Sequence, residues 1–161
     1  MPEKCPVCRS EAKKENYDEN SRLHRFDCIR CGIYEIEHIE LIELSNKDFN
    51  KLALSHWIRT QNEKGYKPDL SNQIYTKEFF ESLKLPNPAV QADNLILYLG
   101  HAAVTHSKPV STDYNYRLKL CAVMGGSDLE DYKYIIEHLY NARLVELDVD
   151  YLDAVDTNMD I

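Results

Sequence analysis

The chain has 161 residues, of which 19 are basic and 27 acidic, so its formal net charge is −8. Apolar residues make up 43% of the sequence and charged residues 29%, a balance typical of globular proteins that excludes general disorder and collagen-like repeats. The length suits one domain, or a small module followed by a domain of about 120 residues. No apolar run is long enough to span a bilayer, and the N-terminus lacks the apolar core of a signal peptide, so we expect a cytoplasmic protein without membrane contact.

The negative charge is concentrated near the C-terminus. Residues 1–126 contain 17 basic and 17 acidic side chains, whereas residues 127–161 contain 2 basic and 10 acidic ones. Binding of nucleic acid through the C-terminal part would need the opposite sign, because lysine and arginine make the contacts to phosphate. The distribution leaves such contact open only for the N-terminal part of the chain.

Four of the five cysteines form two C-x2-C pairs, Cys5 with Cys8 and Cys28 with Cys31. In a chain without a secretion signal disulfides are not expected, and two such pairs at this separation predict a zinc site. Each pair forms a tight turn that brings two sulfurs to one face, and two facing turns complete a tetrahedral site with Zn–S distances of about 2.3 Å. Because protein sulfurs then fill all four positions, we expect one structural Zn2+ rather than a catalytic one.

Sequences with period-two alternation enter and leave the second cysteine pair, at residues 22–27 and 33–40. Such alternation predicts strands, and strands joined to two cysteine turns resemble the zinc-ribbon family over about residues 3–41. The resemblance implies a metal-stabilised hairpin or three-stranded sheet that binds DNA, RNA or protein, or that braces a neighbouring domain. His24 and His38 could replace a sulfur in a variant site, although four cysteines already suffice.

A small basic group in the same module is the candidate for nucleic acid contact: Lys13, Lys14, Arg22 and Arg25. The module is nearly neutral, since residues 1–32 hold 7 basic and 6 acidic side chains. Four thiolates and one Zn2+ would add a net charge of about −2. An ordinary solvated surface is therefore the simpler interpretation of these side chains, and phosphate contact is the alternative.

After the ribbon the apolar period changes from two to 3.6, which predicts helices. We expect a helix over about residues 46–64, capped at Ser45 and ended by Gly65. A short helix over residues 77–83, capped by Thr76, should follow. These helices form a connector between the ribbon and the rest of the chain.

The C-terminal half predicts a second domain that is mainly helical. A broad apolar face predicts a buried helix over about residues 89–105, and residues 116–124 fit either a strand or a short helix. A cap at Ser127 should begin a helix over residues 128–142. Residues 143–149 are expected to form a strand.

Helix, short element, helix and strand over residues 89–150 resemble a winged-helix domain in topology. The second wing strand would have to come from the tail after residue 150, unless the natural protein is longer than this chain. The expected fold class is α+β, in which a four-cysteine zinc ribbon precedes an α-rich, winged-helix-like domain. The expected domains are the ribbon at 1–44, the helical connector at 45–86, and the winged-helix-like domain with an acidic tail at 87–161.

Motifs for common catalytic chemistry are not found in the sequence. It has no glycine-rich phosphate loop, no G-x-S-x-G turn and no H-E-x-x-H helix, and the lone Cys121 is more consistent with a small buried residue than with a nucleophile. The ribbon followed by helices resembles the N-terminal regions of some bacterial multidomain proteins, including ones thought to act in anti-phage defence with a C-terminal effector domain such as TIR.

These observations predict a non-catalytic, zinc-stabilised recognition or regulatory module that contacts a protein partner or a second copy of itself. Two alternatives stay open. One is a DNA- or RNA-binding transcriptional regulator that acts through the ribbon. The other is a fragment of an effector enzyme whose catalytic domain lies beyond residue 161.

Overall fold

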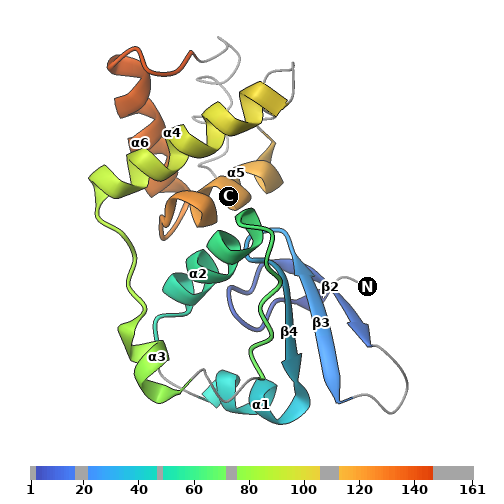
Figure 1. Ribbon diagram of the computed structural model, residues 1–161. Coiled ribbons are helices and arrows are strands. Elements are labelled where there is room, and N and C mark those ends of the chain that lie inside the picture. The colour runs from blue at the N-terminus through green and yellow to red at the C-terminus, as the bar shows by residue number, and fades with distance from the viewer. Residues whose placement is uncertain (1–2, 17–21, 47–48, 72–75, 106–112, 147–161) are drawn as a thin grey trace, which may run out of the picture. The chain divides into compact units, whose positions relative to one another are not determined.

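The computed structural model describes residues 3–16, 22–46, 49–71, 76–105 and 113–146 (Figure 1). The chain divides into two compact units, Met1–Leu85 and Pro86–Ile161. The first unit joins an antiparallel sheet to helices, and the described part of the second unit is helical, so the fold class is α+β. Among the described helices, none combines the length and the apolar character needed to cross a membrane.

The first unit begins with a four-stranded antiparallel sheet in the order β1-β2-β3-β4 (Figure 1). Its strands are β1 (Glu3–Lys4), β2 (Glu11–Asn16), β3 (Leu23–Cys28) and β4 (Gly32–Glu37). The strands predicted around the second cysteine pair are therefore confirmed, but β4 is shorter than expected. The strand ends at Glu37 because a helix begins at His38. Leu41 and Leu44 of this helix are three residues apart, so both pack against the core of the first unit.

Three helices complete the first unit: α1 (His38–Asn46), α2 (Lys51–Glu63) and α3 (Lys77–Ser82). The sequence predicts one helix that starts at about residue 46, and this start is wrong. Helix α2 begins at Lys51 and is capped by Asn50, whose side chain accepts a hydrogen bond from the Ala53 N–H at 3.0 Å. Gly65 at φ +85° follows the end of α2 and Thr76 caps α3, as the sequence predicts.

Sheet and helices of the first unit share one hydrophobic core. The buried side chains come from every layer: Phe26, Tyr34 and Ile36 from the sheet, Leu44 from α1, Leu54 and Ile58 from α2, and Phe80 from α3. Helix α2 packs against β4, beside the sheet in Figure 1. The segments expected as a ribbon and a separate connector thus share a core and lie in one compact unit.

The outer edge of β4 is covered by segments of its own unit. The Asn62 side chain accepts a hydrogen bond from the Ile33 N–H at 2.7 Å and donates one to the Ile33 carbonyl at 2.9 Å, as a neighbouring strand would. Further along, the Glu35 N–H donates to the Pro68 carbonyl and the Leu70 N–H donates to the Glu35 carbonyl. An open strand edge invites pairing with another chain, and these contacts occupy that edge.

The described part of the second unit consists of α4 (Pro88–Thr105), α5 (Tyr114–Met124) and α6 (Leu129–Asn141). The two long helices predicted here are confirmed, and the ambiguous segment around residue 120 is helical. Helix α6 is capped by Asp128 rather than Ser127, since the Asp128 carboxylate accepts from the Asp131 N–H at 3.0 Å. The helices pack around a core of their own: Leu95, Leu120, Cys121, Met124, Tyr132, Ile135, Ile136 and Leu139.

The strand expected at 143–149 is not found in its described part, residues 143–146. Arg143 has φ 60°, and the Arg143 and Leu144 N–H groups donate to the carbonyls of Tyr140 and Leu139. This pair of bonds is a Schellman motif, which turns the backbone at a helix end and prevents an extended continuation there. The rest of the expected strand lies outside the described residues, and the winged-helix topology is not confirmed.

Candidate metal site

The four paired cysteines meet where two loops of the sheet face each other. Cys5 and Cys8 lie between β1 and β2, whereas Cys28 is the last residue of β3 and Cys31 directly precedes β4. Their sulfurs all lie within 4.8 Å of one another. The Sγ–Sγ distances are 3.8 Å between Cys5 and Cys31 and 3.4 Å between Cys8 and Cys28.

These distances fit a tetrahedral metal site. A tetrahedron with Zn–S bonds of about 2.3 Å has sulfur–sulfur edges of about 3.8 Å. The Cys5–Cys31 distance equals that edge, and the Cys8–Cys28 distance needs an adjustment of a few tenths of an ångström. The four cysteines are therefore positioned to hold a metal ion in an arrangement compatible with a structural zinc.

Left-handed backbone after each pair shapes both cysteine turns. Arg9, which follows Cys8, has φ 64°, and Gly32, which follows Cys31, has φ +89°. Each turn thereby reverses tightly, and in the second turn the Cys31 N–H donates to Cys28 Sγ at 3.4 Å. An N–H pointing at sulfur stabilises the thiolate that metal binding requires.

The site is sheltered from water on most sides. Cys5, Cys28 and Cys31 are at most 1% exposed, and Cys8 is half-buried. Hydrogen bonds from Cys28 lower the pKa of the Cys5 and Cys8 thiols, whereas burial raises the pKa of the Cys31 thiol. Thiolates gathered in a buried site repel one another, and a dication on their shared face offsets that repulsion.

Two buried hydroxyl groups reach the sulfurs from outside the cysteine turns. The Tyr34 hydroxyl on β4 lies 3.2 Å from Cys5 Sγ, and Ser55 Oγ on α2 lies 3.1 Å from Cys31 Sγ. Both residues are 0% exposed. The cysteine cluster is thus hydrogen-bonded to the sheet on one side and to helix α2 on the other.

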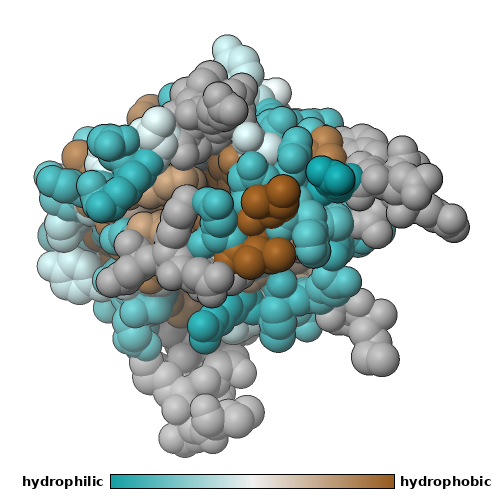
Figure 2. Space-filling model, turned by 90° about the horizontal axis from the view of Figure 1, so that it is seen from below, coloured by the Kyte–Doolittle hydropathy of each residue, from teal (hydrophilic) through white to brown (hydrophobic). Residues whose placement is uncertain are grey.

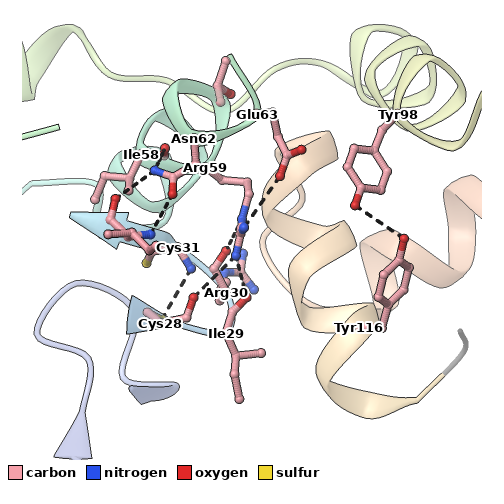
Figure 3. A network of polar contacts seen from close by, with 12 residues as sticks. Cys28, Ile29, Arg30, Cys31, Ile58, Arg59, Asn62, Glu63, Tyr98 and Tyr116 are labelled. Carbon is pink, nitrogen blue, oxygen red and sulfur yellow. Dashed lines mark hydrogen bonds and ion pairs between the residues drawn. The ribbon is translucent and has the colours of Figure 1, made fainter. Parts of the chain in front are cut away.

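Helix α2 also binds the backbone of the second cysteine turn (Figure 3). The Arg59 guanidinium donates from Nε to the Arg30 carbonyl at 2.9 Å and from Nη2 to the Ile29 carbonyl at 2.6 Å and the Cys28 carbonyl at 3.4 Å. Arg59 is itself buried, and Glu63 lies one turn along, 3.6 Å from Nη1. The turn that carries two of the sulfurs is therefore held by one arginine.

The sequence indicates these outer contacts only weakly. Ser55, Arg59 and Asn62 are polar residues spaced four and three apart, so they share the helix face that also carries Ile58. Polar residues on an otherwise apolar helix face usually have specific hydrogen-bond partners. The spacing of these three residues is therefore a signal in the sequence that they make such contacts. Their partners lie 24 to 31 residues away in sequence, so no local pattern identifies them.

The two histidines considered as variant ligands lie outside the cysteine cluster. His24 Nε2 and His38 Nδ1 are 3.3 Å apart, and the rings meet edge to face. Burial lowers the pKa of His24, so the neutral imidazole is favoured there. Cys121 belongs to the second unit, where it is buried and its thiol donates to the Asp128 carbonyl at 3.1 Å.

The four basic residues proposed for phosphate contact do not share one face of the sheet. Lys13 and Arg25 lie on the exposed face, whereas Lys14 is on the face that bears Phe26, and Arg22 precedes β3. Strand register puts Lys13 opposite Asp27 and Arg25 between Glu15 and Glu35. Phosphate contact by this group stays a prediction.

Comparison with protein-family models, with curated proteins and with solved structures finds no match to this chain.

Proposed function

We propose that the four cysteines bind one structural Zn2+ and that the chain is a non-catalytic recognition module that acts in the cytoplasm through contacts with protein. The observation that carries the proposal is the meeting of four sulfurs, three of them fully buried, at distances that suit a tetrahedral metal. With four protein ligands, no coordination position is left for a water or a substrate, which favours a structural role over a catalytic one.

Charge favours protein over nucleic acid as the partner. The exposed face of β2, β3 and β4 carries two basic and five acidic side chains, namely Lys13 and Arg25 with Glu11, Glu15, Asp27, Glu35 and Glu37. A surface that binds phosphates needs a basic excess. Helix α6 is also acidic, with Glu130 and Asp131 in its first turn.

Exposed apolar side chains on α1 favour contact with a protein. Ile39 and Ile42 are 55% and 53% exposed and lie three residues apart, on one side of the helix. Figure 2 views the molecule from below Figure 1 and shows hydrophobic side chains exposed among hydrophilic ones. Adjacent exposed isoleucines are a feature of surfaces that bind other proteins.

Native mass spectrometry tests the metal part of the proposal. We expect about one zinc ion per chain, lost in Cys28→Ser together with the folded sheet. Cys121→Ser is the matched control, since Cys121 lies in the other unit, and it should keep the zinc. A wild-type chain that binds no zinc, or a Cys28→Ser variant that binds as much zinc as the wild type, would contradict the proposal.

Light scattering over a concentration series, together with affinity capture, tests the contact with protein. We expect self-association or one stoichiometric partner, weakened at least tenfold by Ile39→Glu combined with Ile42→Glu. Leu97→Glu, at an exposed leucine of the other unit, is the control and should bind normally. A monomer without partners, or salt-dependent binding of DNA or RNA lost in Arg25→Ala, would instead support the alternative.

A further inference from the structure

We infer that helix α2 is part of the metal site: its Ser55 hydroxyl is an outer-shell donor to the Cys31 thiolate, and occupancy of the site controls the docking of α2 on the sheet. The inference rests on the proposed zinc binding. It adds residues that a C-x2-C motif does not contain.

The chemistry of Ser55 supports this role. Ser55 Oγ is 3.1 Å from Cys31 Sγ, and both residues are 0% exposed. When Cys31 is a metal-bound thiolate it has no proton to share, so the hydroxyl is the member of the pair that donates. A hydrogen bond to a buried anionic sulfur is stronger than one to a neutral group, and it withdraws charge from the ligand.

The docking of α2 depends on the geometry of the second cysteine turn. The three carbonyls that Arg59 binds belong to Cys28, Ile29 and Arg30, which point toward the helix only while the turn is closed. Gly32 belongs to the same contact, since a Cβ there would lie 2.7 Å from Asn62 Oδ1. Loss of the metal opens the turn and removes these acceptors together.

The chain provides an internal reporter of this docking. Trp57 is the only tryptophan, it lies on α2, and it packs against the core of the first unit with its ring centroid 5.1 Å from that of Phe79. If α2 undocks, the Trp57 ring passes into water and its emission shifts to longer wavelength. The Trp57 emission therefore reports whether α2 stays docked on the sheet.

The first experiment uses Co2+ as the probe in the full chain. We expect Ser55→Ala to bind Co2+ about tenfold more weakly in competition with a chelator, and its sulfur-to-metal charge-transfer band to move to longer wavelength. Thr60→Ala is the matched control on the same helix, because the Thr60 hydroxyl donates to the His56 carbonyl at 2.9 Å. Equal affinity and equal bands in Ser55→Ala and wild type would overturn the role of Ser55.

The second experiment needs no variant, so it holds even if Ser55→Ala fails to fold. Removal of zinc from the wild-type chain by a chelator should shift the Trp57 emission to longer wavelength, and added zinc should restore it. An unchanged emission after complete zinc removal would overturn the coupling of α2 to the metal. A wild-type chain that binds neither Co2+ nor zinc would overturn the proposed function as well.

Discussion

Single residues in left-handed backbone set the shape of the metal site. Arg9 and Gly32 each follow the second cysteine of a pair, and each has a positive φ. Arginine at φ 64° is tolerated after the first pair, where it is exposed. At Gly32 the space that a Cβ would fill is occupied by the Asn62 amide, so glycine is required for two independent reasons.

This difference gives a prediction with an internal control. Gly32→Ala should destabilise the zinc-loaded chain by about 2–4 kcal/mol, the sum of left-handed strain and the clash with Asn62. Gly65→Ala has nearly the same backbone, φ +85°, with nothing within 4 Å of its Cβ, so it should cost only about 1 kcal/mol. Urea unfolding measures both. Equal losses would show that the contact with Asn62 contributes nothing.

Helix ends in the second unit are satisfied by side chains from a neighbouring helix. Gln91 on α4 is buried, and its Nε2 donates at 3.1 Å to both the Pro86 and the Gly125 carbonyls. One turn along, Asn94 Nδ2 donates to the Met124 carbonyl at 3.3 Å. The carbonyls at the end of a helix have no partner within the helix, and these amides bind two of them at the end of α5.

Replacing Gln91 should lower the stability of the second unit selectively. Gln91→Met keeps the length of the side chain but leaves the two carbonyls without a donor, at an expected cost of about 1–3 kcal/mol. Asp93→Ala, an exposed change on the same helix, should stay within about 0.5 kcal/mol of the wild type. Thermal unfolding followed by circular dichroism measures the stability of both variants. A Gln91→Met chain as stable as Asp93→Ala would show that the hydrogen bonds of Gln91 do not stabilise the unit.

At the scale of the whole molecule, two cores depend on different forces. The core of the first unit includes the cysteine cluster, whose four sulfurs are positioned to hold a metal ion. On the proposed function, that ion holds the sulfurs together. The second unit builds its core from the apolar faces of α4, α5 and α6, with no cysteine of the cluster among them. Stability of the first unit should therefore follow metal concentration, and stability of the second should not.

Metal removal is the direct test of this division. A chelator should raise the amide exchange rates of β3 and β4 by about a hundredfold or more, since the sheet loses the bond between its two cysteine turns. Amides of Leu95, Leu120 and Ile136 in the second core should exchange at unchanged rates. Hydrogen exchange read by mass spectrometry measures both sets in one sample. Equal acceleration in the two units would contradict independent cores.

Local rules explain where prediction from the sequence succeeds and where it fails. Thr76 and Gly65 mark helix ends because a cap acts on backbone groups within a few residues. The cap of α2 is Asn50 rather than Ser45, and residues 143–146 turn rather than extend, because apolar spacing alone does not choose between neighbouring caps or between a strand and a Schellman motif. The phosphate-binding residues and the partner remain predictions.

The sequence by itself determined which four cysteines could hold a metal ion, because two residues between cysteines suffice to place two sulfurs on one face. Only the tertiary structure decided what surrounds those ligands. Tyr34, Ser55 and Arg59 reach the cluster or its turn from elements far along the chain. Their roles depend on how α2 packs on β4, a long-range arrangement that arises from burial of a shared core and that no local spacing encodes.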